Sequence, residues 1–189
     1  MVFNGDQDTV QNTILTFPWY WRYLVQWFGS RLSRTNRSAE AQEKMIVEFL
    51  NGVCVLCRIQ ALKEFGLMDE TMGGYVEDAD WSYRARKIGW VSMFVPVPSI
   101  LHQQETTDYH HYSMKSFMLR RNHVYWHFKN KRYVQAFGFF ATPLLLALTR
   151  ALLASITGKE AKRHWMYVRK FQVVGLGILL NRPIGPWFG

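Results

Sequence analysis

Three carboxylates stand within four residues, at Glu77, Asp78 and Asp80, shortly after the pair Gly73-Gly74. A carboxylate can take the proton from a hydroxyl group as that hydroxyl attacks an electrophile. Neighbouring carboxylates also raise one another's pKa, which makes a better base near neutral pH. The same residues favour the amino end of a helix, where the helix dipole stabilises negative charge. The cluster therefore indicates a general base, a helix cap, or a division of its members between the two roles.

A helix is predicted from Asp78 onward, and it would position the cluster. An apolar stripe at helical spacing follows it: Trp81, Ala85 and Ile88. Asp80 and Arg84 have the spacing of an ion pair between successive turns. Gly89 predicts the end of the helix.

The segment upstream, residues 47–58, is apolar and rich in β-formers, which predicts a buried strand with Asn51-Gly52 entering or interrupting it. Cys54 and Cys57 would then point to opposite faces of the strand. A redox pair usually opens a helix, and a zinc site needs two further ligands nearby, so neither function is favoured. A short helix is expected over residues 59–65, ended by Gly66.

Three other polar groups are candidate sites. His102 follows a strand predicted over residues 90–97, a position where a lone histidine is usually structural. His110-His111 reads as a solvated loop pair. Asp6-Gln7-Asp8 has a metal-binding form, but it lies in a turn-like amino-terminal segment and is interpreted as an exposed turn.

Charge divides the chain in two. Residues 1–108 carry 10 Lys/Arg and 13 Asp/Glu, whereas residues 109–189 carry 13 Lys/Arg and one acidic residue, Glu160. Long apolar runs interleave these basic residues, which favours a membrane surface over nucleic acid. The segment 134–156 is read as an interfacial or re-entrant helix, a membrane span or a buried helix. The polar, acidic start of the chain predicts no signal peptide, and two cysteines fit a reducing, cytosolic setting.

Four pieces of the chain, taken in order, resemble family 2 glycosyltransferases, especially the rhamnosyltransferase-like members that build bacterial polysaccharides, including those of the cell wall. The pieces are residues 51–58 (NGVCVLCR), 61–70 (ALKEFGLMDE), 75–90 (YVEDADWSYRARKIGW) and 95–102 (VPVPSILH). Arg121-Asn122 and the apolar, basic tail also look like that group. The resemblance is clearest over residues 47–125 and falls on the acceptor side of the family's enzymes.

The resemblance implies an α/β chain with a partial GT-A fold, the acceptor half of a nucleotide-diphospho-sugar transferase, followed by membrane-associated helices. Family members invert the sugar that they transfer from a nucleotide-sugar to an acceptor hydroxyl, usually with Mg²⁺ or Mn²⁺. Asp78 then corresponds to the catalytic base, and His102 to a histidine that helps to hold the metal and the diphosphate. The resemblance and the local chemistry together suggest acceptor-binding roles for five residues: Asn51, Gly52, Glu77, Asp80 and Trp81.

The family places its nucleotide-binding half first, and too little sequence precedes Asn51 to build one. We therefore expect a fragment or split subunit that needs a second chain for donor binding and is inactive without it. Three segments are expected: a variable lead-in over 1–46 with an aromatic-rich helical segment over residues 17–32, a catalytic part over 47–128 and a basic, apolar, membrane-associated helical tail over 129–189. The acceptor would be a polysaccharide or lipid-linked saccharide at the cytoplasmic face of the membrane. The alternative is a non-catalytic module that binds the acceptor or the membrane.

Overall fold

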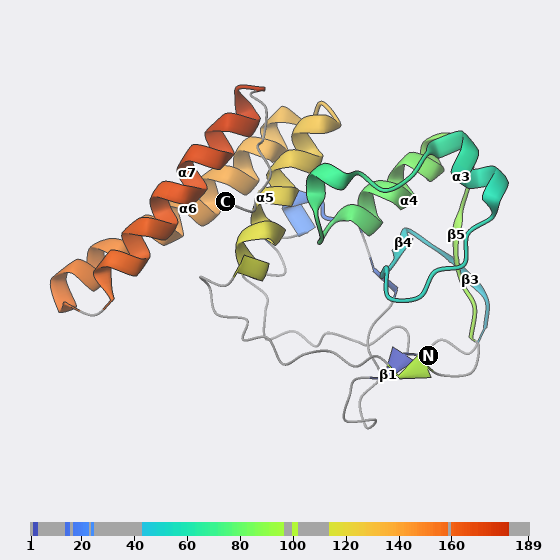
Figure 1. Ribbon diagram of the computed structural model, residues 1–189, viewed down its shortest axis with the longest axis horizontal. Helices are drawn as coiled ribbons and strands as arrows, with labels where there is room; N and C mark the ends of the chain where they lie inside the picture. The colour runs from blue at the N-terminus through green and yellow to red at the C-terminus, as the bar shows by residue number, and fades with distance from the viewer. Residues whose placement is uncertain are drawn as a thin grey trace. The chain divides into compact units, whose positions relative to one another are not determined.

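The computed structural model describes residues 2–3, 14–15, 17–22, 24, 43–96, 100–101, 114–158 and 160–181. The chain forms two compact units (Figure 1). The first comprises Met1–Asp69 and Glu77–Thr107, and the second comprises Glu70–Val76 and Asp108–Gly189.

The described strands of the first unit form three short two-stranded pairs. β1 (Val2–Phe3) lies parallel to β6 (Ile100–Leu101), β2 (Ile14–Leu15) is antiparallel to β4 (Phe49–Leu50), and β3 (Met45–Val47) is antiparallel to β5 (Ser92–Phe94). The chain is thus mixed α/β and mostly helical, which is compatible with the predicted class. The GT-A fold itself is not shown by these short pairs and stays a proposal.

A small apolar core joins two of these strands. Val47 and Phe94 are buried against each other, with Met45 and Leu50 packed around them. Phe17 stacks on Phe49 with ring centroids 5.7 Å apart, so the start of the predicted aromatic segment contributes to the interior. Of that segment, the structure describes residues 17–22 and 24.

The predicted strand over residues 47–58 is wrong beyond Leu50, where the chain leaves the sheet and turns. The Asn51 side chain accepts a hydrogen bond from the Val53 N–H at 3.2 Å, and the Gly52 N–H donates to a side chain rather than to a strand. Backbone groups that are satisfied in this way have no need of a ladder partner. Cys54 is therefore exposed and Cys57 half-buried, both as free thiols, and not on opposite faces of a strand.

Two helices of the first unit carry the acidic cluster and its support. α3 (Ile59–Phe65) ends where predicted, because Gly66 adopts φ +82° and donates its N–H to the Leu62 carbonyl at 2.9 Å. α4 (Glu77–Lys87) begins one residue before the predicted start.

The predicted apolar stripe of α4 is confirmed only in part. Ala85 is buried, but Ile88 lies beyond the end of the helix and is 52% exposed. Ala79 and Asp80 are buried instead. The helix therefore turns its cluster of carboxylates partly inward, which hydrophobic spacing alone did not indicate.

The second unit is built from three long helices: α5 (Met114–Lys129), α6 (Tyr133–Thr157) and α7 (Ala161–Leu179). Each packs against the other two, and α6 and α7 run side by side as an antiparallel hairpin (Figure 1). Small side chains allow this close approach. A Cβ added at Gly175 would lie 2.2 Å from a ring carbon of Phe140. The helix expected over residues 134–156 is confirmed within one residue at each end.

Within the described part of the chain, α6 is the one helix that is long and apolar enough to cross a membrane. One third of its most apolar window is buried inside the unit. Pro143 lies within it and is buried.

Candidate active site

Asp78 is the second residue of α4, and its carboxylate closes the turn that follows β4. Its Oδ2 accepts a hydrogen bond from the Gly52 N–H at 3.1 Å, and its Oδ1 accepts one from the Ala79 N–H at 2.8 Å. The bond to Ala79 is the local cap expected of an aspartate at a helix start. The bond to Gly52 is a long-range contact that capping does not require.

The surroundings of Asp78 hold its proton more tightly than water does. Burial raises the pKa of the Asp78 carboxyl, and this outweighs the opposite effect of hydrogen bonds from the backbone N–H groups of Gly52, Ala79 and Asp78 itself. The pKa of Glu77 is raised as well, first by burial and then by the neighbouring charge of Asp78. Two adjacent carboxyls with raised pKa values are suited to accept a proton.

Glu77 keeps one oxygen available. Its Oε2 is buried, and it accepts no hydrogen bond from any residue that the structure describes. A buried acceptor in this state is costly, and a ligand hydroxyl would satisfy it.

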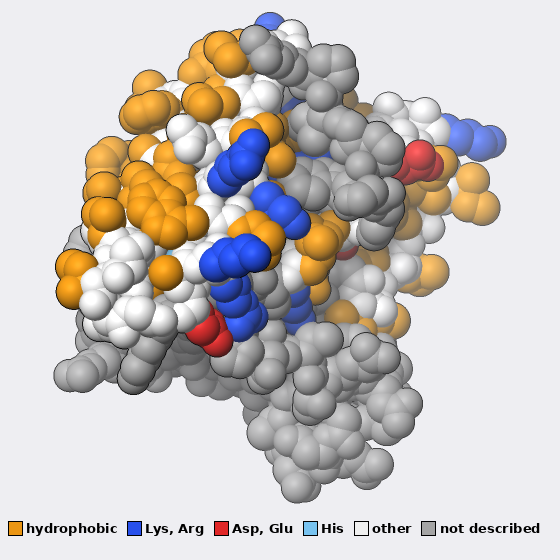
Figure 2. Space-filling model, turned by 60° about the vertical axis from the view of Figure 1, so that its left-hand side comes forward, with side chains coloured by type: hydrophobic (Ala, Val, Ile, Leu, Met, Phe, Trp, Pro, Cys, Tyr) orange, Lys and Arg blue, Asp and Glu red, His pale blue; other side chains and the backbone are white. Residues whose placement is uncertain are grey.

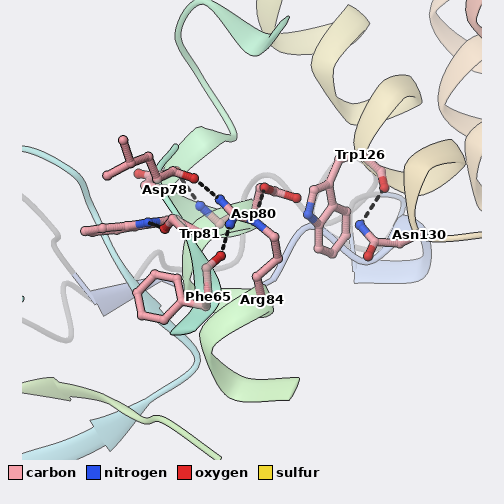
Figure 3. Close-up of polar contacts among 10 residues, drawn as sticks. Phe65, Asp78, Asp80, Trp81, Arg84, Trp126 and Asn130 are labelled. Carbon is pink, nitrogen blue, oxygen red and sulfur yellow. Dashed lines mark hydrogen bonds and ion pairs between the residues drawn. The ribbon is translucent and has the colours of Figure 1, made fainter. Parts of the chain in front are cut away.

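Asp80 has a structural role, which its complete burial and its ion pair indicate. The residue is 0% exposed, and its Oδ2 forms the predicted ion pair with Arg84 Nε at 2.9 Å (Figure 3). Arg84 also donates to the carbonyls of Phe65 and, at 2.5 Å, Leu67. The pair therefore fastens α4 to the end of α3.

Trp81 supports the same junction. Its Nε1 donates to the Gly66 carbonyl at 2.9 Å, and its ring meets that of Phe65 edge-on with centroids 5.4 Å apart. The indole is half-buried. These contacts give Trp81 a packing role, and a role in binding an acceptor stays a prediction.

The structure thus brings four predicted residues together at one end of α4. Asn51 and Gly52 form the turn, Asp78 accepts from it, and Glu77 precedes Asp78 in the helix. Gly52 is not required by space, since a Cβ there would lie an ordinary 3.5 Å from the Asp78 Cβ. Its contribution is its N–H group.

The predicted metal ligand, His102, lies outside the described residues, as do Asp6-Gln7-Asp8 and His110-His111. Among the residues that the structure describes, no three His, Cys, Asp or Glu side chains converge as a metal site would require. Glu77, Asp78 and Asp80 are close in sequence, but they do not form such a group. The described residues therefore do not by themselves fit a divalent metal.

A second group of polar contacts lies in the second unit and was not predicted. Asn122 Nδ2 is 2.9 Å from the carbonyl of Met72, 2.6 Å from that of Gly74 and 2.7 Å from that of Tyr75. Arg121 donates to the Thr71 carbonyl at 2.6 Å and to Asn122 Oδ1 at 2.5 Å. Both side chains are buried.

These contacts hold an unusual loop. Four successive residues have positive φ: Gly73, Gly74, Tyr75 and Val76. Such values are uncommon for tyrosine and unfavourable for the β-branched valine, so the surrounding contacts must stabilise them. The paired glycines were a visible signal of the loop, but nothing in the sequence linked them to Asn122.

Comparison with known proteins gives a partial relationship. No family model matches the chain, and no solved structure matches it at a significant level. Two curated proteins match, both named N-acetylglucosaminyl-diphospho-decaprenol L-rhamnosyltransferase, from Mycobacterium tuberculosis strains CDC 1551 / Oshkosh and ATCC 25618 / H37Rv. Each is 33% identical to this chain over 89 residues, which cover 42% of this chain and 29% of the relative. Over less than half its length the chain is thus similar to a rhamnosyltransferase, and it spans under a third of that relative.

Proposed function

We propose that the chain is the acceptor-side part of an inverting glycosyltransferase, with a GT-A-like fold and Asp78 as the catalytic base. The observation that carries the proposal is the state of Asp78: a half-buried carboxylate with a raised pKa, held by the Gly52 N–H beside Glu77. The partial similarity to a rhamnosyltransferase supports the reaction class.

The chemistry asks one step of Asp78. A sugar hydroxyl is a poor nucleophile at neutral pH, so a base must take its proton as its oxygen attacks the anomeric carbon of the donor. The nucleoside diphosphate leaves from the opposite face, which inverts that carbon. Asp78 can hold the proton because burial has raised its pKa. The acceptor would be a polysaccharide or a lipid-linked saccharide at the cytoplasmic face of the membrane.

Glu77 is the strongest candidate for a contact with the acceptor, because its buried Oε2 lacks a hydrogen-bond donor among the described residues. Asn51 and Gly52 border the same carboxylates and would line the acceptor pocket with it. For Asp80 and Trp81 we propose a share in shaping this pocket by holding α4 in place.

Donor binding is proposed to depend on groups outside the described site. His102 is the proposed protein ligand of Mg²⁺ or Mn²⁺, because the described residues do not by themselves form a centre for the ion. When bound, such an ion would offset the charge of the leaving diphosphate. The nucleotide-binding half is proposed to come from a second chain, without which we expect no transfer.

The test combines the purified full chain, in complex with the donor-binding second chain, with membranes of its source that lack the chain and a panel of radiolabelled nucleotide-sugars. We expect labelled polysaccharide or lipid-linked sugar with the wild-type chain. Asp78→Asn should reduce labelling by about a hundredfold or more, as expected for loss of a general base. Asparagine keeps an oxygen that can accept from Gly52, so the turn should survive. Glu70→Gln, an exposed carboxylate in the same stretch, is the matched control. Undiminished transfer by Asp78→Asn would show that the base is wrongly assigned.

A non-catalytic acceptor- or membrane-binding module is the second candidate. It is favoured by the short span of the similarity, 29% of each relative. Calorimetry separates the two functions. A non-catalytic module would bind the acceptor saccharide with the same affinity whether or not a nucleoside diphosphate and the donor-binding second chain are present. It would also support no sugar transfer when both are present.

A further inference from the structure

One end of the α6–α7 hairpin projects beyond α5. The first turns of α5 meet the middle of α7, since the Phe117 ring contacts those of Tyr167 and Phe171 and Arg120 donates to the Tyr167 hydroxyl at 2.6 Å. The rest of the hairpin, residues 150–157 and 161–166, extends past this point (Figure 1). We call it the hairpin tip.

The hairpin tip exposes large apolar side chains that a water-facing helix pair would normally bury. Ile156 is 82% exposed, and four neighbours are also open to solvent: Leu152, Leu153, Trp165 and Met166. Trp165 donates from Nε1 to Ser155 Oγ at 3.0 Å, so its polar atom is satisfied while part of its ring stays exposed. An amphipathic tryptophan with aliphatic neighbours is typical of the boundary between water and hydrocarbon.

Exposed cations accompany these apolar side chains. Four are exposed on α7, at or next to the hairpin tip: Lys162, Arg163, Arg169 and Lys170. The acidic residue between the two helices is Glu160, which lies 3.4 Å from Arg163. Figure 2 shows a group of exposed hydrophobic side chains with Lys and Arg side chains next to them.

The register of the two helices argues against a membrane span. Phe140 faces Gly175 and Ser155 faces Trp165, so the middle of α6 is level with residues 170–175 of α7. If α6 crossed a bilayer with α7 attached, the exposed Arg169 and Lys170 would lie near the hydrocarbon centre. Charged groups at that depth are unfavourable unless they face protein or water. A hairpin that lies at the interface avoids this.

We propose that the hairpin tip inserts into the headgroup region of an anionic phospholipid bilayer. Its exposed aliphatic side chains and Trp165 enter the acyl boundary, and its cations contact phosphate and other acidic headgroup oxygens. This goes beyond the proposed transferase function, because it stands on α6 and α7 alone. It also removes the membrane span from the three readings of residues 134–156.

Charge and surface chemistry favour lipid over the other occupants. A second copy of the chain would set the same cations against one another, which is unfavourable. Nucleic acid would pair with the cations but leave Leu152, Leu153 and Ile156 in water. An anionic bilayer matches both kinds of side chain.

The experiment is vesicle flotation of the full chain with phosphatidylcholine alone and with a phosphatidylcholine–phosphatidylglycerol mixture. We expect strong binding to the anionic vesicles and at least about tenfold weaker binding to neutral ones, because each cation near the surface adds to the attraction. High salt should weaken the anionic binding. Alkaline carbonate should release the bound chain, whereas a spanning helix would be retained.

Two matched pairs of variants locate the contact. Neutralising the four cations (K162Q, R163Q, R169Q and K170Q together) should lower partition into anionic vesicles by about a hundredfold. The control neutralises four exposed cations of the first unit (K44Q, R58Q, K63Q and R86Q) and should bind as the wild type does. Leu152→Ser with Ile156→Ser should weaken binding by about tenfold or more. Val134→Ser with Phe137→Ser, exposed at the other end of α6, should not.

Circular dichroism checks that each variant keeps its helices. The proposal is overturned if the tip variants bind as tightly as their controls, or if the chain resists carbonate. It is also overturned if duplex DNA competes for the chain and the apolar variants bind DNA normally, or if the chain is a stable dimer that ignores vesicles. Failure of sugar transfer would leave the lipid measurements unaffected, so the two proposals can fail separately.

Discussion

The Gly52 N–H donates to Asp78 Oδ2 across 26 residues of sequence, at 3.1 Å. This bond ties the turn after β4 to the start of α4. It also directs one oxygen of the proposed base toward a backbone group, and leaves the position of the carboxylate dependent on that turn.

Two substitutions of Gly52 distinguish the contribution of its N–H group from that of its small size. Gly52→Pro removes the donor, and we expect the free energy of unfolding to fall by about 1–3 kcal/mol, the usual cost of losing a hydrogen bond to a charged group. Gly52→Ala keeps the donor, and its Cβ would make an ordinary contact with Asp78, so it is the matched control. Urea denaturation measures both. Equal losses in the two variants would contradict a role for the N–H.

Removing the charge of Asp78 should change the titration of Glu77. Since the Asp78 carboxylate raises the pKa of Glu77, Asp78→Asn should lower that pKa toward its ordinary value. Carboxyl ¹³C NMR of the two proteins measures it. Glu43→Gln, an exposed change at the edge of the first unit's described core, should leave the Glu77 titration in place. An unmoved Glu77 titration in Asp78→Asn would mean that the two carboxyls do not interact.

The raised pKa of Asp78 also predicts the sign of a pH effect on stability. The folded state binds the Asp78 proton more tightly than the unfolded chain does. The stabilisation that results from this proton is fully present below the unfolded pKa of about 3.8. It is lost as pH rises through the folded pKa. Asp78→Asn should therefore gain stability relative to the wild type as pH rises out of this window. Urea midpoints measured at several pH values test this, and a constant difference would contradict it.

Arg84 should matter more for stability than its partly exposed position suggests. Arg84→Ala leaves the fully buried Asp80 carboxylate without its ion pair and frees the carbonyls of Phe65 and Leu67. Breaking one partner of a buried pair costs about 3–5 kcal/mol, and the partial exposure of Arg84 places this case toward the lower end. Thermal unfolding measures it, with Arg86→Ala on the exposed side of α4 as control. A loss as small as that of the control would show that the Asp80 carboxylate tolerates the loss of Arg84.

His123 should make the second unit sensitive to acid. Burial, with a smaller effect from the charge of His127, lowers the pKa of His123 to about 3. Its ring also packs on Phe139 with centroids 4.7 Å apart. The contribution of neutral His123 to the free energy of unfolding is fully present above the unfolded pKa of about 6.5. It falls as pH drops toward 3, by up to about 1.4 kcal/mol per pH unit.

The matched change for this histidine is His123→Leu, which cannot take up a proton. The melting temperature of the His123→Leu protein should depend less on pH, between pH 6.5 and 4, than that of the wild type. Circular dichroism melts at several pH values provide the measurement. An identical pH slope in both proteins would assign the acid sensitivity to other groups.

Sequence reasoning found the helices because their apolar periodicity and stop signals are local. The stop at Gly66 is an example, since one glycine with positive φ ends α3 as predicted. The strand prediction failed over residues 51–58, because it rested on the number of β-forming residues. The sequence did not show that side chains would accept the backbone hydrogen bonds in place of a neighbouring strand. Those side chains are Asn51 and the distant Asp78 carboxylate.

The acidic cluster could be singled out from sequence, but the different roles of its members could not. The i,i+4 spacing predicted the pair of Asp80 with Arg84. The complete burial of Asp80 and the open Oε2 of Glu77 depend on packing from other segments, which no local pattern encodes. The contacts of Asn122 could not be predicted from the sequence for the same reason.

The loop held by Asn122 has a consequence for the time at which it can form. Its carbonyl partners precede Asn122 by 47–50 residues, so they leave the ribosome well before the side chain that fixes them. At about 5–20 residues per second this delay is roughly 2–10 s. During that interval the contacts that stabilise positive φ at Tyr75 and Val76 are missing, so this loop should reach its final conformation later than the segments next to it in the sequence.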